Sequence, residues 1–167
     1  MDALRVSGIF VADGSDVLHC RYFGNLLQLG ASTHRDLENK ICSQVDESVA
    51  IIDDYIVCRQ KEGDLIAFII GDLNCCEVIL RNALATLFDA FDGSPLQSFT
   101  RDVFEQHLSY FIIAVDELFD DGYVFETSAA SLKKKIQVKS DLLPLIDMSI
   151  GDVFSKAKTS FLRSLLQ

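Results

Sequence analysis

The hydrophobic pattern of this chain changes its period near Gly71, and that change restricts the possible folds more than any other feature. Before Gly71, apolar residues form short runs or alternate with polar ones, which is typical of β-strands. After Gly71 they recur every three or four residues, which is typical of amphipathic helices. Strands followed by segregated helices favour an α+β fold, in which helices cover an antiparallel sheet.

Five segments of the first half have strand-like sequences. The turn at 13–16 contains Asp-Gly between two such segments, which predicts a hairpin. In the second strand of this hairpin, strict alternation would place Leu18 and His19 on opposite faces of the sheet. A second turn at 61–64 joins the last two strands. The predicted strands are Leu4–Val11, Val17–Phe23, Val49–Ile52, Tyr55–Arg59 and Leu65–Gly71.

The remaining predicted elements are helices. A short helix precedes the third strand, with Leu37 and Ile41 on its apolar face. Asn74 and Glu77 have the spacing of a capping box and begin a long helix, whose broad apolar stripe predicts contact on two sides. The expected helix starts are Thr33, Asn74, Thr100, Ser128 and, beyond Pro144, Ser149.

Composition and charge narrow the possible functions. The 167 residues suffice for one ordinary domain, and 49% apolar content excludes a disordered chain. Lys and Arg number 15 against 25 Asp and Glu, and the net charge of −10 disfavours nucleic acid as a partner. The five cysteines include no C-x-x-C pair, which suits a reducing compartment. With no signal-peptide pattern at the N-terminus, we expect a cytosolic protein.

The sequence lacks the usual motifs of phosphate-binding loops, dinucleotide-binding folds, serine hydrolases and zinc proteases. We therefore predict no catalytic residue, no metal and no cofactor. Four carboxylates crowd the end of a predicted helix without the alternation of an EF-hand loop. Because acidic groups there oppose the helix dipole, we expect some of them to accept hydrogen bonds from a neighbouring segment. These carboxylates belong to Asp116, Glu117, Asp120 and Asp121.

Two other local features suggest testable roles. Lys133–Lys135, with Lys139, is the only basic cluster, and it is either a solvated helix face or a contact for a phosphoinositide or an acidic partner. Asp121 and Gly122 form a structural turn just after a predicted helix. We expect Gly122 to be the left-handed C-cap of this helix, so that Gly122→Val costs about 1–2 kcal/mol.

The segment 111–126 resembles the zeta-subunit family of coatomer. It carries A-V-D-E, then D-G, then a glutamate, although Tyr123 stands where the family has a second glycine. The resemblance runs from Leu4 to Leu166 and is weaker in the first 60 residues, where it rests mainly on the order of elements. The matching residues are Val11-Ala12-Asp13-Gly14, Leu87-Phe88-Asp89, Ala114-Val115-Asp116-Glu117, Asp121-Gly122, Glu126, Pro144-Leu145 and Ser164-Leu165-Leu166.

The resemblance implies a longin-like fold, with a five-stranded antiparallel sheet flanked by helices on both faces. It also implies a non-enzymatic subunit of the COPI coat that packs against the trunk of the coatomer gamma subunit. The other coatomer subunits would be partners, and an Arf-family GTPase an indirect one. The location would be cytoplasmic and peripheral on Golgi membranes and COPI-coated vesicles, in Golgi-to-ER and intra-Golgi transport. A sigma subunit of a clathrin adaptor, which binds dileucine cargo signals, is the alternative, and a grafted hydrolase site is a second one.

Partner contact is expected on two helices. The short helix has few apolar positions and would bury little by itself, so Leu37 and Ile41 are candidates. The long helix adds Leu84, Phe88 and Phe91. On this hypothesis, Leu37→Glu abolishes assembly and leaves the fold intact.

Overall fold

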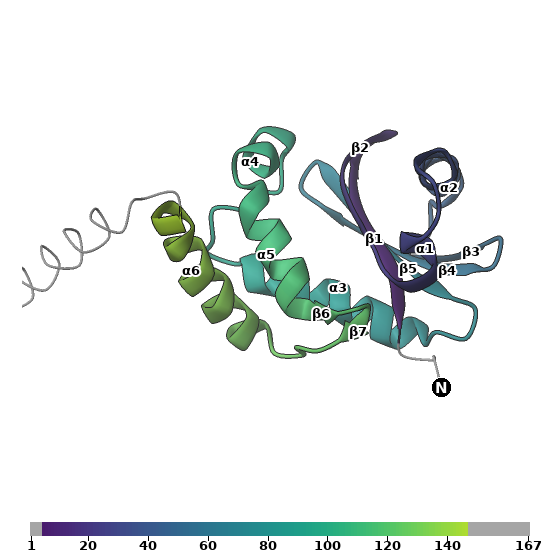
Figure 1. Ribbon diagram of the computed structural model, residues 1–167. Helices are drawn as coiled ribbons and strands as arrows, with labels where there is room; N and C mark the ends of the chain where they lie inside the picture. Colours follow the sequence, from purple (N-terminus) through teal and green to yellow (C-terminus); the bar gives the residue numbers. More distant parts are fainter. Residues whose placement is uncertain (1–4, 147–167) are drawn as a thin grey trace, which may run out of the picture.

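The computed structural model describes residues 5–146, with side chains through residue 142. Its centre is a five-stranded antiparallel sheet in the order β2-β1-β5-β4-β3, which confirms the predicted α+β fold (Figure 1). The strands are β1 (Val6–Asp13), β2 (Asp16–Tyr22), β3 (Val49–Ile52), β4 (Tyr55–Glu62) and β5 (Leu65–Asp72).

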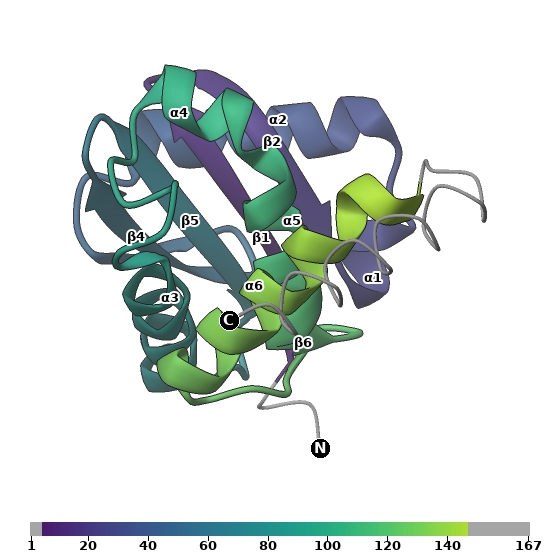
Figure 2. The ribbon, with the colours of Figure 1, turned by 90° about the vertical axis from the view of Figure 1, so that its left-hand side faces the viewer.

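Helices cover both faces of this sheet. One face carries the N-terminal helices α1 and α2, and the other carries α3 and α5, with α6 packed against both as an outer layer (Figures 1 and 2). The contact of α3 with both the sheet and α6 confirms that its broad apolar stripe serves two sides. The helices are α1 (Gly24–Leu27), α2 (Ala31–Gln44), α3 (Glu77–Phe91), α4 (Arg101–Gln106), α5 (Leu108–Leu118) and α6 (Ala129–Ile146).

The sheet separates two hydrophobic cores. Because side chains alternate along a strand, Ile9 and Ile69 enter the core beneath α3 and α5, whereas Phe10 and Phe68 enter the core beneath α2. The rings of Phe10 and Phe68 stack with their centroids 4.8 Å apart. The central strands β1 and β5 are thus buried on both faces, which explains why their sequences are nearly continuous apolar runs.

An irregularity in β2 contradicts the expected alternation at Leu18. Opposite Val11 and Ala12 of β1 stand His19 and Val17, so Leu18 is an extra residue in a β-bulge. Leu18 packs against the core beneath α3 and α5, and the His19 ring makes an edge-to-face contact with Phe111 on the same side of the sheet. The bulge therefore turns two consecutive side chains toward one face.

Two predicted helix caps are wrong. The N-cap of α2 is Gly30, not Thr33, so the helix begins earlier than expected. The N-cap of α3 is Cys76, and the structure contains no capping box there. Instead, the Asn74 backbone N–H donates to the Asp72 carboxylate at 2.9 Å, because a local turn after β5 competes with helix capping.

The second half also divides differently from the prediction. The helix expected over 100–118 breaks at His107, which lies between α4 and α5. Ser128 does cap α6, since its Oγ accepts the Ser131 backbone N–H at 3.3 Å. The helix that follows is not brief, because it continues through Pro144 to Ile146. The helix expected from Ser149 lies outside the described residues.

Candidate partner surface

Most of the side chains predicted to contact a partner are buried within this chain. Leu37 and Ile41 belong to the core beneath α2, and Leu84 and Phe91 belong to the core beneath α3 and α5. Leu37 keeps 8% of its surface exposed and the other three 2% or less, whereas Phe88 is half-buried. A helix with few apolar residues can still bury them when a sheet lies beneath it. These four side chains are therefore unavailable to a partner, and Leu37→Glu would disturb folding itself.

The predicted turn at Asp121 and Gly122 closes a small hairpin. It joins β6 (Phe119–Asp120) to β7 (Tyr123–Val124), and both turn residues have positive φ, 45° at Asp121 and 86° at Gly122. Such a two-residue turn suits the twist of paired strands. The preceding helix α5 ends at Leu118, so the interpretation of Gly122 as its C-cap is wrong.

This hairpin is fastened to the start of β1. The Val6 backbone N–H donates to the Gly122 carbonyl oxygen at 2.7 Å. Arg5 donates through Nε to the Asp121 carbonyl oxygen at 3.0 Å, and its guanidinium pairs with the Asp121 carboxylate at 2.5 Å. The hairpin thus has a fixed position relative to the sheet, although its own two strands are very short.

Two lysines of the basic cluster form ion pairs with carboxylates near the end of α5 and after the hairpin. Glu117 pairs with Lys139 and, at 3.8 Å, with Lys135, which also reaches Glu126 at 2.9 Å. Asp116 faces Arg21 of β2 at 3.4 Å. Carboxylates near the end of α5 are thus offset by cations from neighbouring elements, as expected from their unfavourable place on the helix dipole. Lys135 and Lys139 therefore support the fold, and they do not form a free basic face.

Glu126 ties the hairpin to α6. Its carboxylate accepts the backbone N–H groups of Thr127 and Ser128 at 3.0 Å and the Ser131 hydroxyl at 2.6 Å. Hydrogen bonds from the Ser131 hydroxyl, Lys135 and the Ser128 backbone lower the pKa of Glu126 to about 2. An ionised Glu126 is therefore part of the N-terminal cap of α6.

The pKa of Glu126 predicts an acid-sensitive contribution to stability. Because the folded-state pKa lies below the ordinary value of 4.5, the contribution is present above pH 4.5 and is lost as the pH falls toward 2. We expect Glu126→Gln to lower the melting temperature at pH 7 and to make little difference near pH 2. Thermal melts of both proteins across this range measure the effect, and a constant difference at every pH would contradict it.

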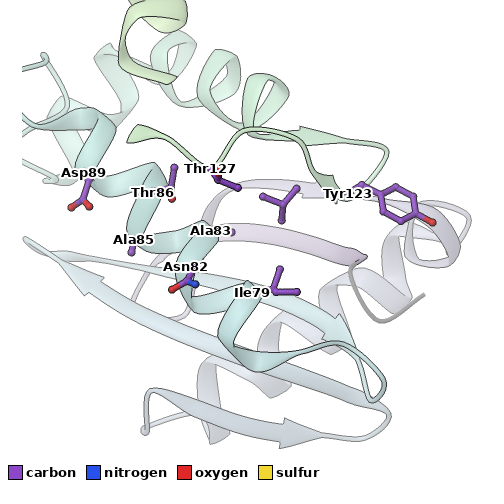
Figure 3. Close-up of a pocket in the computed structure, with 9 residues that line it drawn as sticks. Ile79, Asn82, Ala83, Ala85, Thr86, Asp89, Tyr123 and Thr127 are labelled. Atoms are coloured by element: carbon purple, nitrogen blue, oxygen red, sulfur yellow. The ribbon is translucent and has the colours of Figure 1, made fainter. Parts of the chain in front are cut away.

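A groove lies between α3 and the β6–β7 hairpin, and its volume is about 470 Å³ (Figure 3). The side chains of Ile79, Ala83 and Val124 give it an apolar floor, because the outer face of α3 meets β7 there. Its volume lies within the range of natural binding pockets. The polar side chains around it are Asn82, Thr86, Asp89 and Thr127.

Two exposed aromatic residues stand on the hairpin beside this groove. Tyr123 lines the groove with 42% of its surface exposed, and Phe125 follows with 71% exposed. The Arg5 guanidinium and the Lys135 ammonium each lie 5.5 Å from the centre of one of these rings, over Tyr123 and Phe125 respectively. Exposed aromatic side chains are typical of the centres of protein interfaces. In the sequence, the alternation of Tyr-Val-Phe-Glu was the only signal for this surface, and it did not predict partner contact.

Among residues 5–142, no group of three or more His, Cys, Asp and Glu side chains is arranged to hold a metal ion. Within the same region, none of the helices has the length and apolar character needed to span a membrane. The groove beside the hairpin and the two exposed rings are referred to below as the hairpin surface, made of Ile79, Ala83, Tyr123, Val124 and Phe125.

Similarity to known proteins extends over nearly the whole chain. No family model matches it. It is 22% identical to coatomer subunit zeta-1 of Bos taurus over 97% of this chain and 93% of that protein. It is 23% identical to the probable coatomer subunit zeta-B of Dictyostelium discoideum, over 92% and 93% of the two chains. For coatomer subunit zeta-1 of Arabidopsis thaliana, the identity is 26% over 77% and 73%.

A structural match agrees with these sequence matches. A chain in a homology model of the full-length AP-3 complex superposes with a TM-score of 0.67, covering 85% of this chain and 97% of that one. Its identity of 10% supports a shared fold alone. The chain is therefore similar to the coatomer zeta subunits over nearly its whole length, and its fold is similar to that of a chain in an adaptor complex.

Proposed function

We propose that this chain is a small, non-catalytic subunit of a COPI-type vesicle coat. The observation that carries this proposal is the match to coatomer zeta subunits from animals, an amoeba and a plant over most of both chains. Matches that extend over nearly the full length favour a shared role, because they include the helices on the surface as well as the core. The chain would then act by filling a place in an assembly.

The proposed partner is the trunk of the coatomer gamma subunit, with the other coatomer subunits and, indirectly, an Arf-family GTPase around it. The protein would be cytoplasmic and would reach Golgi membranes and vesicles only as part of the coat. Its own net charge of −10 supports indirect membrane attachment, because anionic lipid repels an acidic surface.

We further place the partner contact at the hairpin surface. Its apolar groove and its two exposed rings provide the features that a buried interface centre needs. The anchoring of the hairpin to Arg5 and Val6 supports this choice, because a rigid surface loses little conformational entropy when it binds.

Affinity purification of the tagged chain from native cytosol tests the function. Coatomer subunits in the eluate at equal stoichiometry are the expected result. Large chains of a clathrin adaptor in their place would favour the sigma-subunit alternative, and a chain recovered alone would contradict the coat role. Hydrolase substrates incubated with the purified protein test the enzyme alternative directly.

Phe125→Glu tests the surface. Since Phe125 is largely exposed, we expect a normal circular dichroism spectrum and melting temperature, but at least tenfold less co-purified partner. Leu27→Glu is the matched control, because Leu27 is 62% exposed on α1 at the opposite face of the sheet. Equal loss of partner in both variants would show that the contact is not specific to the hairpin surface. Normal recovery with Phe125→Glu would exclude this surface.

A further inference from the structure

A second groove lies on the other side of α3, between this helix and β4. Its volume is about 540 Å³. Three cationic residues line it, Arg59 and Lys61 from β4 and Arg81 from α3, and we call it the basic groove. Val78, which is 57% exposed, and Ala85 supply apolar surface beside the charges. A groove lined by three cations is unexpected in a chain whose net charge is −10.

Within the described residues, these three cations form no ion pair with a carboxylate. Half of the Lys and Arg side chains in the described region form ion pairs with Asp or Glu, as expected where acidic groups are abundant. Of the others, half line the basic groove. Those without an ion pair in the described region are Arg35, Arg59, Lys61, Arg81, Lys133 and Lys134.

The acidic residues next to the groove do not form ion pairs with its three cations. Glu62 accepts a hydrogen bond from the Gln60 side chain at 2.7 Å, and it makes no ion pair with the three cations. Glu77 stands one helical turn before Arg81, yet no ion pair joins the two side chains. Arg59 donates to the backbone carbonyl oxygen of Asp46 at 3.3 Å, not to its carboxylate.

The backbone beside the groove is open as well. The pairing of β3 with β4 ends at Cys58, and the Arg59 backbone N–H then donates to the Ser48 carbonyl oxygen at 2.9 Å. From Gln60 to Glu62, β4 pairs in the described structure with β5 alone. This edge of the sheet therefore offers backbone groups next to the cations, where an extended segment of polypeptide can lie.

We propose that the basic groove binds an acidic segment of a partner protein. Carboxylates of that segment would pair with Arg59, Lys61 and Arg81, and an apolar side chain would rest on Val78 and Ala85. The groove is lined by residues distinct from those of the hairpin surface, so this proposal does not depend on the coat role.

Fluorescence anisotropy with a labelled peptide of eight glutamates and two leucines measures this binding on the purified chain. A peptide with glutamine at every glutamate position is the neutral control. We expect binding of the acidic peptide at 50 mM NaCl, weaker binding at 300 mM NaCl because salt screens exposed charges, and no binding of the neutral peptide. Equal binding of the two peptides, or none of either, would overturn the proposal.

Two triple variants separate the groove from general charge attraction. Arg59→Gln, Lys61→Gln and Arg81→Gln together should weaken binding about tenfold, the sum of three partly screened ion pairs. Arg35→Gln, Lys133→Gln and Lys134→Gln remove the same charge elsewhere and should weaken it less than about threefold. Equal loss in both triple variants would contradict a specific site. Vesicles of phosphatidylcholine with one fifth phosphatidylserine test whether the groove binds anionic lipid. Binding to these vesicles without binding to the peptide would also contradict the proposal.

Discussion

Replacing Gly122 by alanine should lower the free energy of unfolding by about 3 kcal/mol or more. Part of this cost is the positive φ of 86°, which disfavours a side chain by about 1–2 kcal/mol. The larger part is steric, since an added Cβ would lie 2.3 Å from the Val6 carbonyl oxygen and 3.0 Å from the Phe23 Cβ. Backbone cannot move away as a flexible side chain can, so the contact between the hairpin and β1 would have to break. Urea unfolding monitored by circular dichroism measures the loss.

Gly14→Ala is the matched control for this prediction. Gly14 also has a positive φ, 60°, but an added Cβ would meet nothing within 4 Å in the turn between β1 and β2. Its loss should therefore be the conformational part alone, about 1 kcal/mol. If the two alanine variants lose the same stability, close packing at Gly122 does not contribute.

Leu37→Glu should lower the free energy of unfolding by about 4 kcal/mol. Leu37 lies in the hydrophobic core beneath α2, and burial there disfavours an ionised carboxylate. Its neighbour Glu38 is also buried and already takes the hydrogen bond of the Tyr22 hydroxyl, so a second acid there has no donor available from Tyr22. Since total stability is usually about 5–15 kcal/mol, such a loss leaves a marginal fold.

Circular dichroism and urea titration of Leu37→Glu and Leu27→Glu distinguish the two positions. Both are leucines on the face of the sheet that α1 and α2 cover, but Leu27 is mostly exposed. We expect the wild-type urea midpoint for Leu27→Glu and a strongly reduced one for Leu37→Glu. A wild-type midpoint for Leu37→Glu would mean that α2 is free to leave the sheet, and Leu37 would again be a candidate for partner contact.

The positions of the five strands along the sequence were predictable, because hydrophobic periodicity reflects burial. The apolar run Leu65–Ile70 and the alternation after the Asp-Gly turn depend only on which faces meet a core. The bulge at Leu18 was not predictable, because a single inserted residue in a half-polar strand leaves no mark in its composition. Similarly, Asn74 and Glu77 have the spacing of a capping box, but the Asp72 carboxylate accepts the Asn74 backbone N–H in place of Glu77.

The candidate surface was harder to predict than the fold. Leu37 and Phe125 are both apolar residues, and the sequence around each does not reveal which one the sheet covers. That difference depends on tertiary packing, since α2 lies across the sheet and the β6–β7 hairpin projects beside α3. In contrast, the prediction that acidic residues at the end of α5 accept hydrogen bonds from neighbouring segments is confirmed. Carboxylates at a helix C-terminus are destabilised by the helix dipole in any fold, so they favour nearby cations.

The central place of β1 and β5 in the sheet has a consequence for how the protein is made. The hairpins β1–β2 and β4–β5 close over short turns, but Phe10 and Phe68 pair across 58 positions of sequence. Pairing between such distant strands is slow, because the chain loses the conformational entropy of a long loop before contacts between the strands can form. During synthesis, the first hairpin therefore leaves the ribosome with the apolar edge of β1 unpaired. Until β5 emerges, that edge can pair with another nascent chain, so aggregation during translation is most sensitive to the time spent between residues 13 and 72.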